Sequence, residues 1–258
     1  GIWTYSPHPL PPKLPPDRDL STLHSDAIFN LGQLNNLDAW LDNPQIVLSP
    51  LIHREAADSS DIETIARVTI HDIYRQEAGE SPGESERERR EFEEAANYVK
   101  AIREGIRRVK NGAEIDIDLV RDLHEILLSG VRGEHKRPGE LRDILVGVDK
   151  EGTQLPDARF VPMAPAKIPY ALKDLLEYIR GGGEYEDLID IALIHYQFET
   201  IHPFRDGNGR VGRLLIMLTL YDWGRLSGPY LYPSAYFNLN KDQYYRRLLQ
   251  ISRNGEWK

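Results

Sequence analysis

The sequence contains the stretch His202-Pro203-Phe204-Arg205-Asp206-Gly207-Asn208-Gly209-Arg210-Val211-Gly212-Arg213, followed at once by the apolar run Leu214-Leu215-Ile216-Met217-Leu218. This order predicts a loop that opens a buried helix at about Asn208. The first turn of a helix has unpaired backbone N–H groups and a partial positive charge, so it attracts anions. Glycines let the backbone curl around an oxyanion, and arginines match the geometry of a phosphate group. The stretch therefore predicts a phosphate site at the start of a buried helix.

Two side chains of this stretch carry groups that can take part in chemistry. His202 can give or take a proton near neutral pH, and Asp206 offers a hard oxygen ligand for a phosphate-bound Mg²⁺. Each has a structural alternative, because the histidine could pack under the loop and the aspartate could cap the following helix. Phe204 is expected to anchor the loop to the core. A phosphate site, a metal ligand and a base together indicate phosphoryl or nucleotidyl transfer.

The stretch resembles the signature of the Fic family, His-x-Phe-x-Asp/Glu-Gly-Asn-Gly-Arg-x-x-Arg, at every fixed position. The resemblance implies an all-α fold, a Fic-type helical bundle with a small β-hairpin flap. It also implies a protein adenylyltransferase, which transfers AMP from ATP to a Ser, Thr or Tyr hydroxyl of a target protein or of itself. His202 would be the catalytic base and Asp206 would hold Mg²⁺. The implied partners are ATP and a hydroxyl-bearing protein target, with a homodimer as a candidate assembly.

The same resemblance assigns two further groups of residues. The nucleotide would be bound by Gly207, Asn208, Gly209, Arg210, Val211, Gly212, Arg213, Asn238 and Tyr244. A flap that aligns the target backbone would comprise Arg159, Phe160, Val161, Pro162 and Met163. The assignment of Tyr244 competes with a place in the core, because aromatic residues at helical spacing usually pack there.

A segment N-terminal to the signature is similar to the family's inhibitory motif, Ser/Thr-x-x-x-Glu-Gly/Asn. Ser59 and Glu63 match this motif, whereas Thr64 departs from it. In the family the glutamate pairs with the second signature arginine, Arg213 here, which otherwise grips the γ-phosphate. Ser60 to Glu63 also has the spacing of a capping box, in which the glutamate folds back on its own helix start. Inhibition by Glu63 and Ser59 and a purely structural cap therefore stay as two interpretations.

Two other functions remain open at this point. In some family members the inhibitory glutamate orients a water molecule that removes AMP, which would make this protein a de-AMPylating hydrolase. A non-catalytic, nucleotide-binding regulatory module is the other alternative.

Composition narrows the class of protein. The formal net charge is −9, from 41 acidic and 32 basic residues, which argues against a nucleic-acid or anionic-membrane partner. The absence of cysteine excludes disulfides and thiolate metal sites. No apolar run approaches the roughly 20 residues that span a membrane. The cytoplasm is the default compartment.

The chain divides into three parts. Residues 1–19 are rich in proline and predict an extended arm. Residues 20–112 form an N-terminal helical region with the inhibitory helix at about 59–76, and residues 113–258 form the catalytic core, which the resemblance suggests is truncated at its C-terminus. Periodicity predicts helices at residues 20–41, 92–109, 117–128, 168–179, 188–198, 208–223 and 241–252. The hairpin would pair residues 144–148 with 159–161.

Overall fold

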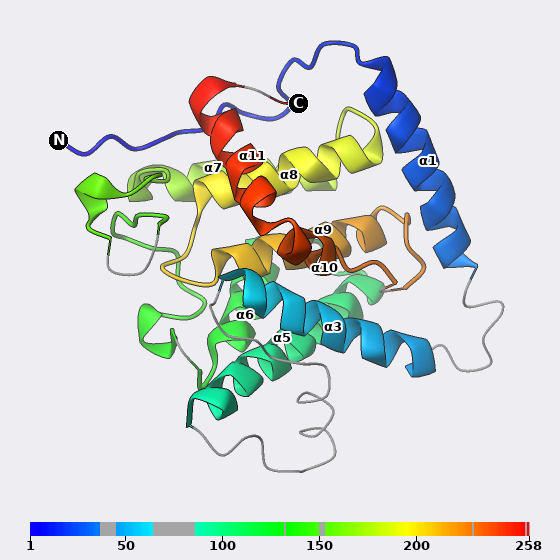
Figure 1. Ribbon diagram of the computed structural model, residues 1–258, viewed down its shortest axis with the longest axis horizontal. Coiled ribbons are helices and arrows are strands. Elements are labelled where there is room, and N and C mark those ends of the chain that lie inside the picture. The colour runs from blue at the N-terminus through cyan, green and yellow to red at the C-terminus, as the bar shows by residue number, and fades with distance from the viewer. Residues whose placement is uncertain are drawn as a thin grey trace.

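The computed structural model describes residues 1–36, 45–63, 86–131, 133–149, 153–228, 230–255 and 257. Over these residues the chain is helical and forms no β-sheet, which confirms the predicted all-α fold (Figure 1). The α-helices are α1 (Arg18–Asn35), α3 (Gln45–Glu63), α5 (Glu86–Lys110), α6 (Ile117–Leu128), α7 (Ile168–Arg180), α8 (Asp187–Ile201), α9 (Asn208–Asp222), α10 (Ser234–Leu239) and α11 (Lys241–Asn254). Short 3₁₀-helices occur at η1 (Glu134–Lys136), η2 (Leu155–Asp157) and η3 (Pro165–Lys167).

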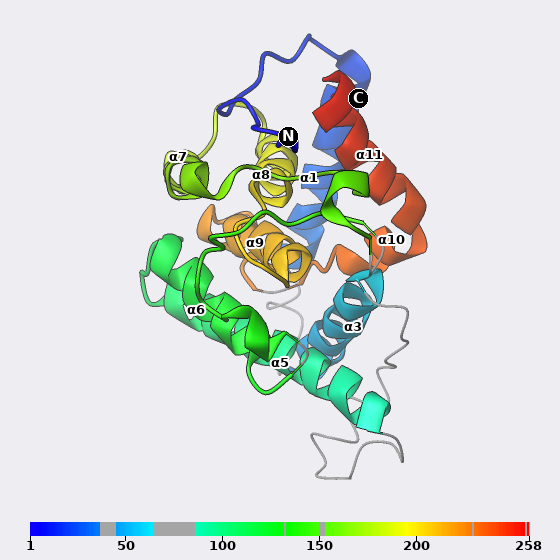
Figure 2. The ribbon, with the colours of Figure 1, turned by 90° about the vertical axis from the view of Figure 1, so that its left-hand side faces the viewer.

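Helix α9 lies at the centre of the bundle, between α8 on one side and α5 and α6 on the other (Figures 1 and 2). It packs against α3, α5, α6 and α8, and its side chains from Arg210 to Leu220 are buried. Because its side chains are close-packed on all sides, the helix cannot rotate without breaking these contacts. The bundle therefore fixes the position of the first turn of α9 and of the loop that leads into it.

Most predicted helices agree with the structure. The observed bounds of α6, α7, α8, α9 and α11 lie within three residues of the predicted ones. α5 spans Glu86–Lys110 and therefore begins six residues before the helix predicted at residues 92–109. α10 was not predicted, because six residues are too few for a periodic pattern. None of the helices in the described ranges is long and apolar enough to cross a membrane.

Helix α3 differs from the prediction at its start. The sequence pattern predicted a helix from about residue 59 to 76, whereas α3 begins at Gln45 and has residue 59 in its last turns. Residues 64–76 lie outside the described part of the chain. Pro50, inside α3, is a signal against a helix, but packing of α3 on α5 and α10 outweighs it.

The predicted hairpin is not confirmed. Among the described residues, the two segments meet at one isolated antiparallel bridge, in which the Val148 N–H donates to Phe160 O at 2.8 Å. The rest of this region is irregular chain with short 3₁₀ turns. Of the predicted pairing between residues 144–148 and 159–161, the described structure therefore contains the Val148–Phe160 pair and no continuous run of strand hydrogen bonds.

Phe204 is expected to be a large contributor to stability, because its ring is fully buried and stacks on His124 with the ring centroids 3.7 Å apart. Phe204→Ala should lower the free energy of unfolding by about 3–5 kcal/mol through lost burial and a residual cavity. Urea unfolding of the purified protein measures this loss. Tyr170→Ala serves as a control because Tyr170 is 73% exposed, and it should change stability by less than about 0.5 kcal/mol. Equal losses for both variants would contradict the anchoring role.

Candidate active site

The loop between α8 and α9 has a conformation that is fixed by its own residues. His202 adopts the left-handed conformation, with φ of 51°, and its N–H donates to Phe198 O at 2.9 Å where α8 ends. Asn208 then closes the loop. Its side-chain oxygen accepts from the Phe204 N–H at 2.8 Å, and its side-chain nitrogen donates to Phe204 O at 2.9 Å. The Asn208 amide is thus occupied by the loop itself.

The His202 ring has a defined hydrogen bond and tautomer. Nδ1 lies 3.2 Å from the carbonyl oxygen of Glu199. Because a carbonyl can only accept, the proton lies on Nδ1, which leaves Nε2 with an available lone pair. Burial, with a smaller effect of the Arg142 guanidinium, lowers the pKa of His202 to about 4. The ring is therefore neutral at physiological pH and can accept a proton.

Arg142 joins the loop to the segment that precedes α7. Its guanidinium donates to the carbonyl oxygens of Ile144 at 2.9 Å, Ile201 at 3.3 Å and His202 at 2.7 Å, and also to that of Met163. Burial lowers the pKa of Arg142 to about 10, so the side chain stays charged at neutral pH. The sequence gives no signal for this role of Arg142, because no spacing along the chain indicates that these carbonyls come together.

The five residues predicted to form the flap, 159–163, lie in the segment that precedes α7. Arg159 is exposed, Phe160 and Val161 are half-buried, and Pro162 and Met163 are buried. The flap therefore presents its N-terminal part to solvent and is attached to the core by its C-terminal part.

Asp206 does not cap α9. The N-cap position is Gly207, without a side-chain hydrogen bond, and Asp206 Oδ1 accepts instead from the Gly207 N–H at 2.7 Å. The backbone oxygen of Asp206 accepts from His124 Nε2 at 2.9 Å, because His124 Nδ1 accepts from the Gly139 N–H. The Asp206 side chain is 29% exposed. One accessible carboxylate beside an anion site fits the way proteins hold Mg²⁺, which takes its other ligands from water and phosphate. The described residues contain no cluster of three or more acidic, histidine or cysteine side chains that would bind a metal unaided.

Two arginines of the first turns of α9 are buried to an unusual degree. The side chains of Arg210 and Arg213 are each 1% exposed. Arg210 Nε lies 3.2 Å from Glu63, whereas Nη1 and Nη2 have no hydrogen-bond partner in the described structure. Their nearest carboxylate oxygens belong to Glu94 at 3.6 Å and Asp206 at 3.9 Å. Buried polar groups are normally hydrogen-bonded, so Arg210 has two donors available for a further anion.

Arg213 is fully engaged by α3. Its Nη2 donates to Glu63 Oε1 at 2.8 Å and to Ser59 O at 2.9 Å, and its Nε donates to Ser59 Oγ at 2.8 Å. Burial alone would raise the pKa of Glu63, but the charges of Arg213 and Arg210 outweigh it and lower that pKa. Burial likewise opposes the charge on Arg213, and the Glu63 carboxylate outweighs it, so the pKa of Arg213 is raised. The ion pair is therefore charged on both sides.

The capping-box interpretation of Ser60 and Glu63 is wrong. Both residues lie within α3, which begins at Gln45, so Ser60 is not at a helix start. The Glu63 carboxylate contacts the arginines of α9 instead of its own backbone. Sequence alone could not decide between the two, because adjacent serines fit both patterns: Ser60 has the spacing of a capping box to Glu63, and Ser59 has that of the inhibitory motif.

The other predicted nucleotide-binding residues have different surroundings in the structure. A Cβ built on Gly209 would overlap the Glu63 carboxylate, so the missing side chain leaves the space which that carboxylate occupies. Val211 packs entirely in the core. Asn238 donates to Asp58 at 3.1 Å, and the Tyr244 hydroxyl is 2.9 Å from His195 Nε2. Asn238 therefore contacts α3, and Tyr244 is packed inward.

The end of α3 is held by residues that the sequence did not indicate. Tyr245 donates to Ile62 O at 3.0 Å and the Lys241 ammonium donates to Asp61 O at 3.1 Å. Glu55 is buried, and it accepts from the Ser234 N–H at 3.0 Å and the Tyr98 hydroxyl at 3.2 Å. Burial raises the pKa of Glu55 to about 7. Its position four residues before Ser59, on the same helix face, is the sequence signal that could have found it.

The chain is similar to known proteins in both sequence and fold. The Fic/DOC family model matches residues 114–220, and the Fic/DOC family N-terminal model matches residues 21–107. The fold is similar to that of a Fic family protein from Desulfovibrio desulfuricans G20, with a TM-score of 0.73 and 23% identity over 93% of this chain and 69% of that one. It is also similar to Fic-1 (residues 134–508) of Caenorhabditis elegans, with a TM-score of 0.60 and 20% identity over 89% of this chain and 64% of that one.

Two relatives are named as protein adenylyltransferases. A probable protein adenylyltransferase of Aquifex aeolicus is 36% identical over 70 residues, which are 27% of this chain and 22% of that protein. The protein adenylyltransferase fic-1 of Caenorhabditis elegans is 29% identical over 113 residues, 43% of this chain and 20% of that protein. The matches thus cover about a fifth of the length of these relatives. With both family models and the fold in agreement, the chain belongs to the Fic/DOC family.

Proposed function

We propose that this protein is a protein adenylyltransferase, which moves AMP from ATP to a Ser, Thr or Tyr hydroxyl of a target protein or of itself. The observation that carries the proposal is the buried Arg210, two of whose guanidinium nitrogens make no hydrogen bond in the described structure, in the same segment as the neutral His202. An anion-binding turn and a proton acceptor are the two parts that nucleotidyl transfer requires. The printed names of the relatives support this class of reaction.

The triphosphate would lie along the first turn of α9. Backbone N–H groups from Gly209 to Gly212 would face the α-phosphate, and Arg210 would bind the outer phosphates through its free nitrogens. Asp206 would hold Mg²⁺, which, when bound, neutralises phosphate charge. This arrangement uses the same residues that form the predicted nucleotide site.

The chemical step follows from the His202 tautomer. The target hydroxyl oxygen would attack the α-phosphorus while Nε2 of His202 accepts its proton, and the bond to pyrophosphate would break. The Nδ1 hydrogen bond to Glu199 keeps the ring in the orientation and tautomer that this step needs. The arginines and the first-turn amides would stabilise the charge that develops on the phosphate oxygens.

The same geometry supports autoinhibition by Glu63. Its carboxylate occupies the two arginines that the outer phosphates need, and Ser59 holds Arg213 in that position. ATP would therefore bind either weakly or in a posture unsuited to in-line attack. In this proposal residues 20–112 regulate residues 113–258, and the flap residues 159–163 align the target backbone by strand pairing.

The pKa of His202 gives a prediction that needs no substrate. Histidine normally titrates near pH 6.5, whereas burial should place the midpoint of His202 near 4. The ring therefore stays neutral as the pH falls from about 6.5 to about 5, so its base function should persist there. NMR titration of the ring protons measures the midpoint, and the spectrum of His202→Ala identifies the signal. A midpoint at or above 6 would contradict the buried, neutral base.

His202→Ala should abolish AMP transfer while leaving ATP binding nearly unchanged. The side chain supplies a proton acceptor and makes no contact with the phosphates in this proposal, and loss of a general base commonly costs about 10²–10⁴ in rate. Transfer is measured with labelled ATP, in self-modification and in lysate, and binding by calorimetry. Near-normal labelling by a folded His202→Ala protein would overturn the assignment.

Glu63→Gly should raise AMP transfer about ten- to a hundredfold. A charge-assisted pair of this kind contributes roughly 1.5–3 kcal/mol, and each 1.4 kcal/mol corresponds to about tenfold in populations. The labelled-ATP assay measures the gain, and melting temperature is recorded on the same sample. Glu63→Asp is the matched control, because it keeps the charge and should give a smaller gain.

The same assay separates the alternative functions. A hydrolase would release AMP from a previously labelled protein and would lose that activity in Glu63→Gly. If the protein is a regulatory binding module, the parent chain and Glu63→Gly would both retain nucleotide, and neither would transfer AMP. Unchanged or lower transfer by a less stable Glu63→Gly protein would end the autoinhibition hypothesis.

A further inference from the structure

The extended segment of residues 159–161 has its backbone acceptors occupied on both edges. Phe160 O accepts from the Val148 N–H at 2.8 Å on one edge. On the opposite edge, Val161 O accepts from the Tyr5 N–H at 2.9 Å, and Arg159 O accepts from the Arg253 guanidinium at 3.2 Å. Carbonyls two residues apart in an extended chain point the same way, so Arg159 and Val161 share an edge. That edge is covered by the N-terminal arm and by α11.

Tyr5 fits this edge through its side chain as well as its backbone. Its ring lies 5.7 Å from the Phe160 ring, centroid to centroid. Its hydroxyl is 3.2 Å from the Tyr196 hydroxyl, which is in turn 3.0 Å from Ser252 Oγ. Each group of Tyr5 thus has a partner. The N–H has Val161 O, the ring has Phe160, and the hydroxyl has the hydroxyl of Tyr196.

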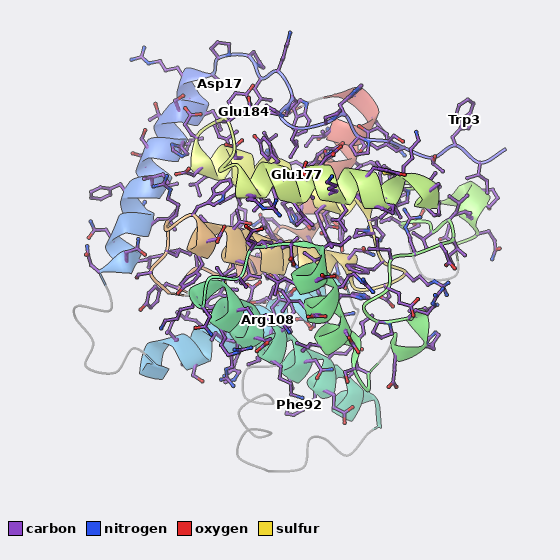
Figure 3. All side chains as sticks on the ribbon, turned by 180° about the vertical axis from the view of Figure 1, so that it is seen from behind. Trp3, Asp17, Phe92, Arg108, Glu177 and Glu184 are labelled. Atoms are coloured by element: carbon purple, nitrogen blue, oxygen red, sulfur yellow. The ribbon has the colours of Figure 1, made fainter. Side chains whose placement is uncertain are left out.

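The arm on either side of Tyr5 makes a few separate contacts near that residue. Ser6 Oγ accepts from the Lys167 ammonium at 3.3 Å, and His8 O accepts from the Gln197 amide at 3.0 Å. Trp3 is 93% exposed and points away from the body of the molecule (Figure 3). Residues 1–6 are not part of a helix, and hydrogen bonds hold them to the body of the molecule at separate points.

We propose that residues 4–6 occupy the edge at which a protein target docks, and that the partner suited to this edge is an extended peptide with a tyrosine at the Tyr5 position. The proposal rests on the proposed function, in which the flap pairs with a target strand. A target strand adds to an exposed backbone edge through backbone hydrogen bonds. Val161 O already accepts from the Tyr5 N–H, so a target strand can use this acceptor only after Tyr5 leaves. An attached competitor acts at an effective concentration of about millimolar for a short flexible tether, so a weak target must displace it. Proline cannot replace the tyrosine, because it has no N–H to donate.

The test uses the full chain and a probe of known sequence, a fluorescein-labelled peptide of residues 1–9 (GIWTYSPHP). Tyr5→Pro removes the donor from the resident arm, so fluorescence anisotropy should show this variant binding the peptide at least about tenfold more tightly than the parent chain does. Trp3→Ala, at an exposed position, should behave as the parent. A peptide N-methylated at its tyrosine should lose at least about tenfold in affinity for Tyr5→Pro. Equal binding of peptide to parent and Tyr5→Pro, or no effect of N-methylation, would overturn the proposal.

A second measurement on the parent chain covers the case in which Tyr5→Pro fails to fold. Millimolar unlabelled peptide should speed hydrogen exchange of the Tyr5 amide, and the N-methylated peptide should not; unchanged exchange would overturn the proposal. Both readouts are taken without ATP, so they do not depend on catalysis. If the peptide displaces the arm but the protein transfers no AMP, the proposed function alone is rejected. If the protein transfers AMP but the peptide does not displace the arm, this docking edge alone is rejected.

Discussion

The burial of two guanidinium groups, Arg210 and Arg213, is the constraint on which the rest of this structure depends. Each is 1% exposed, and a charge removed from water needs a partner of opposite sign. The helix that carries them is buried along its length, so the arginines cannot turn outward to reach solvent. An anion must come to them. Helix α3 meets this requirement with Glu63, and the contacts of α3 with α10 and α11 hold that carboxylate in place.

Much of the fold was predictable from periodicity, and much of the candidate site from its residue types. The apolar run after Gly212 and the Gly-Asn-Gly turn located α9 and its loop to within one residue. The start of α3 was not predictable, because Pro50 is a local signal against the helix that tertiary packing supplies. The family resemblance implied the pairing of Glu63 with Arg213, which the structure contains. The carbonyl oxygens around Arg142 belong to residues far apart in sequence, and a local sequence pattern carries no information on such contacts.

Arg142 gives the loop and the flap a common support. One guanidinium reaches the backbone of both His202 and Met163. The arm lies on the outer edge of the segment that ends at Met163, through the Tyr5 N–H and Val161 O. A short series of hydrogen bonds and two residues of backbone thus connects the arm to the loop that carries His202.

Gly209 has a consequence for how such a protein could diverge. A Cβ there would overlap the Glu63 carboxylate, and the same space lies over the turn that attracts phosphate. In the proposed function the Glu63 carboxylate and the phosphates of ATP use the same space, and a side chain at Gly209 would narrow that space for both. A substitution at the turn would then change inhibition and nucleotide binding together. Substitutions in α3, or in the residues of α10 and α11 that contact it, could change the strength of this inhibition without altering His202 or the first turn of α9.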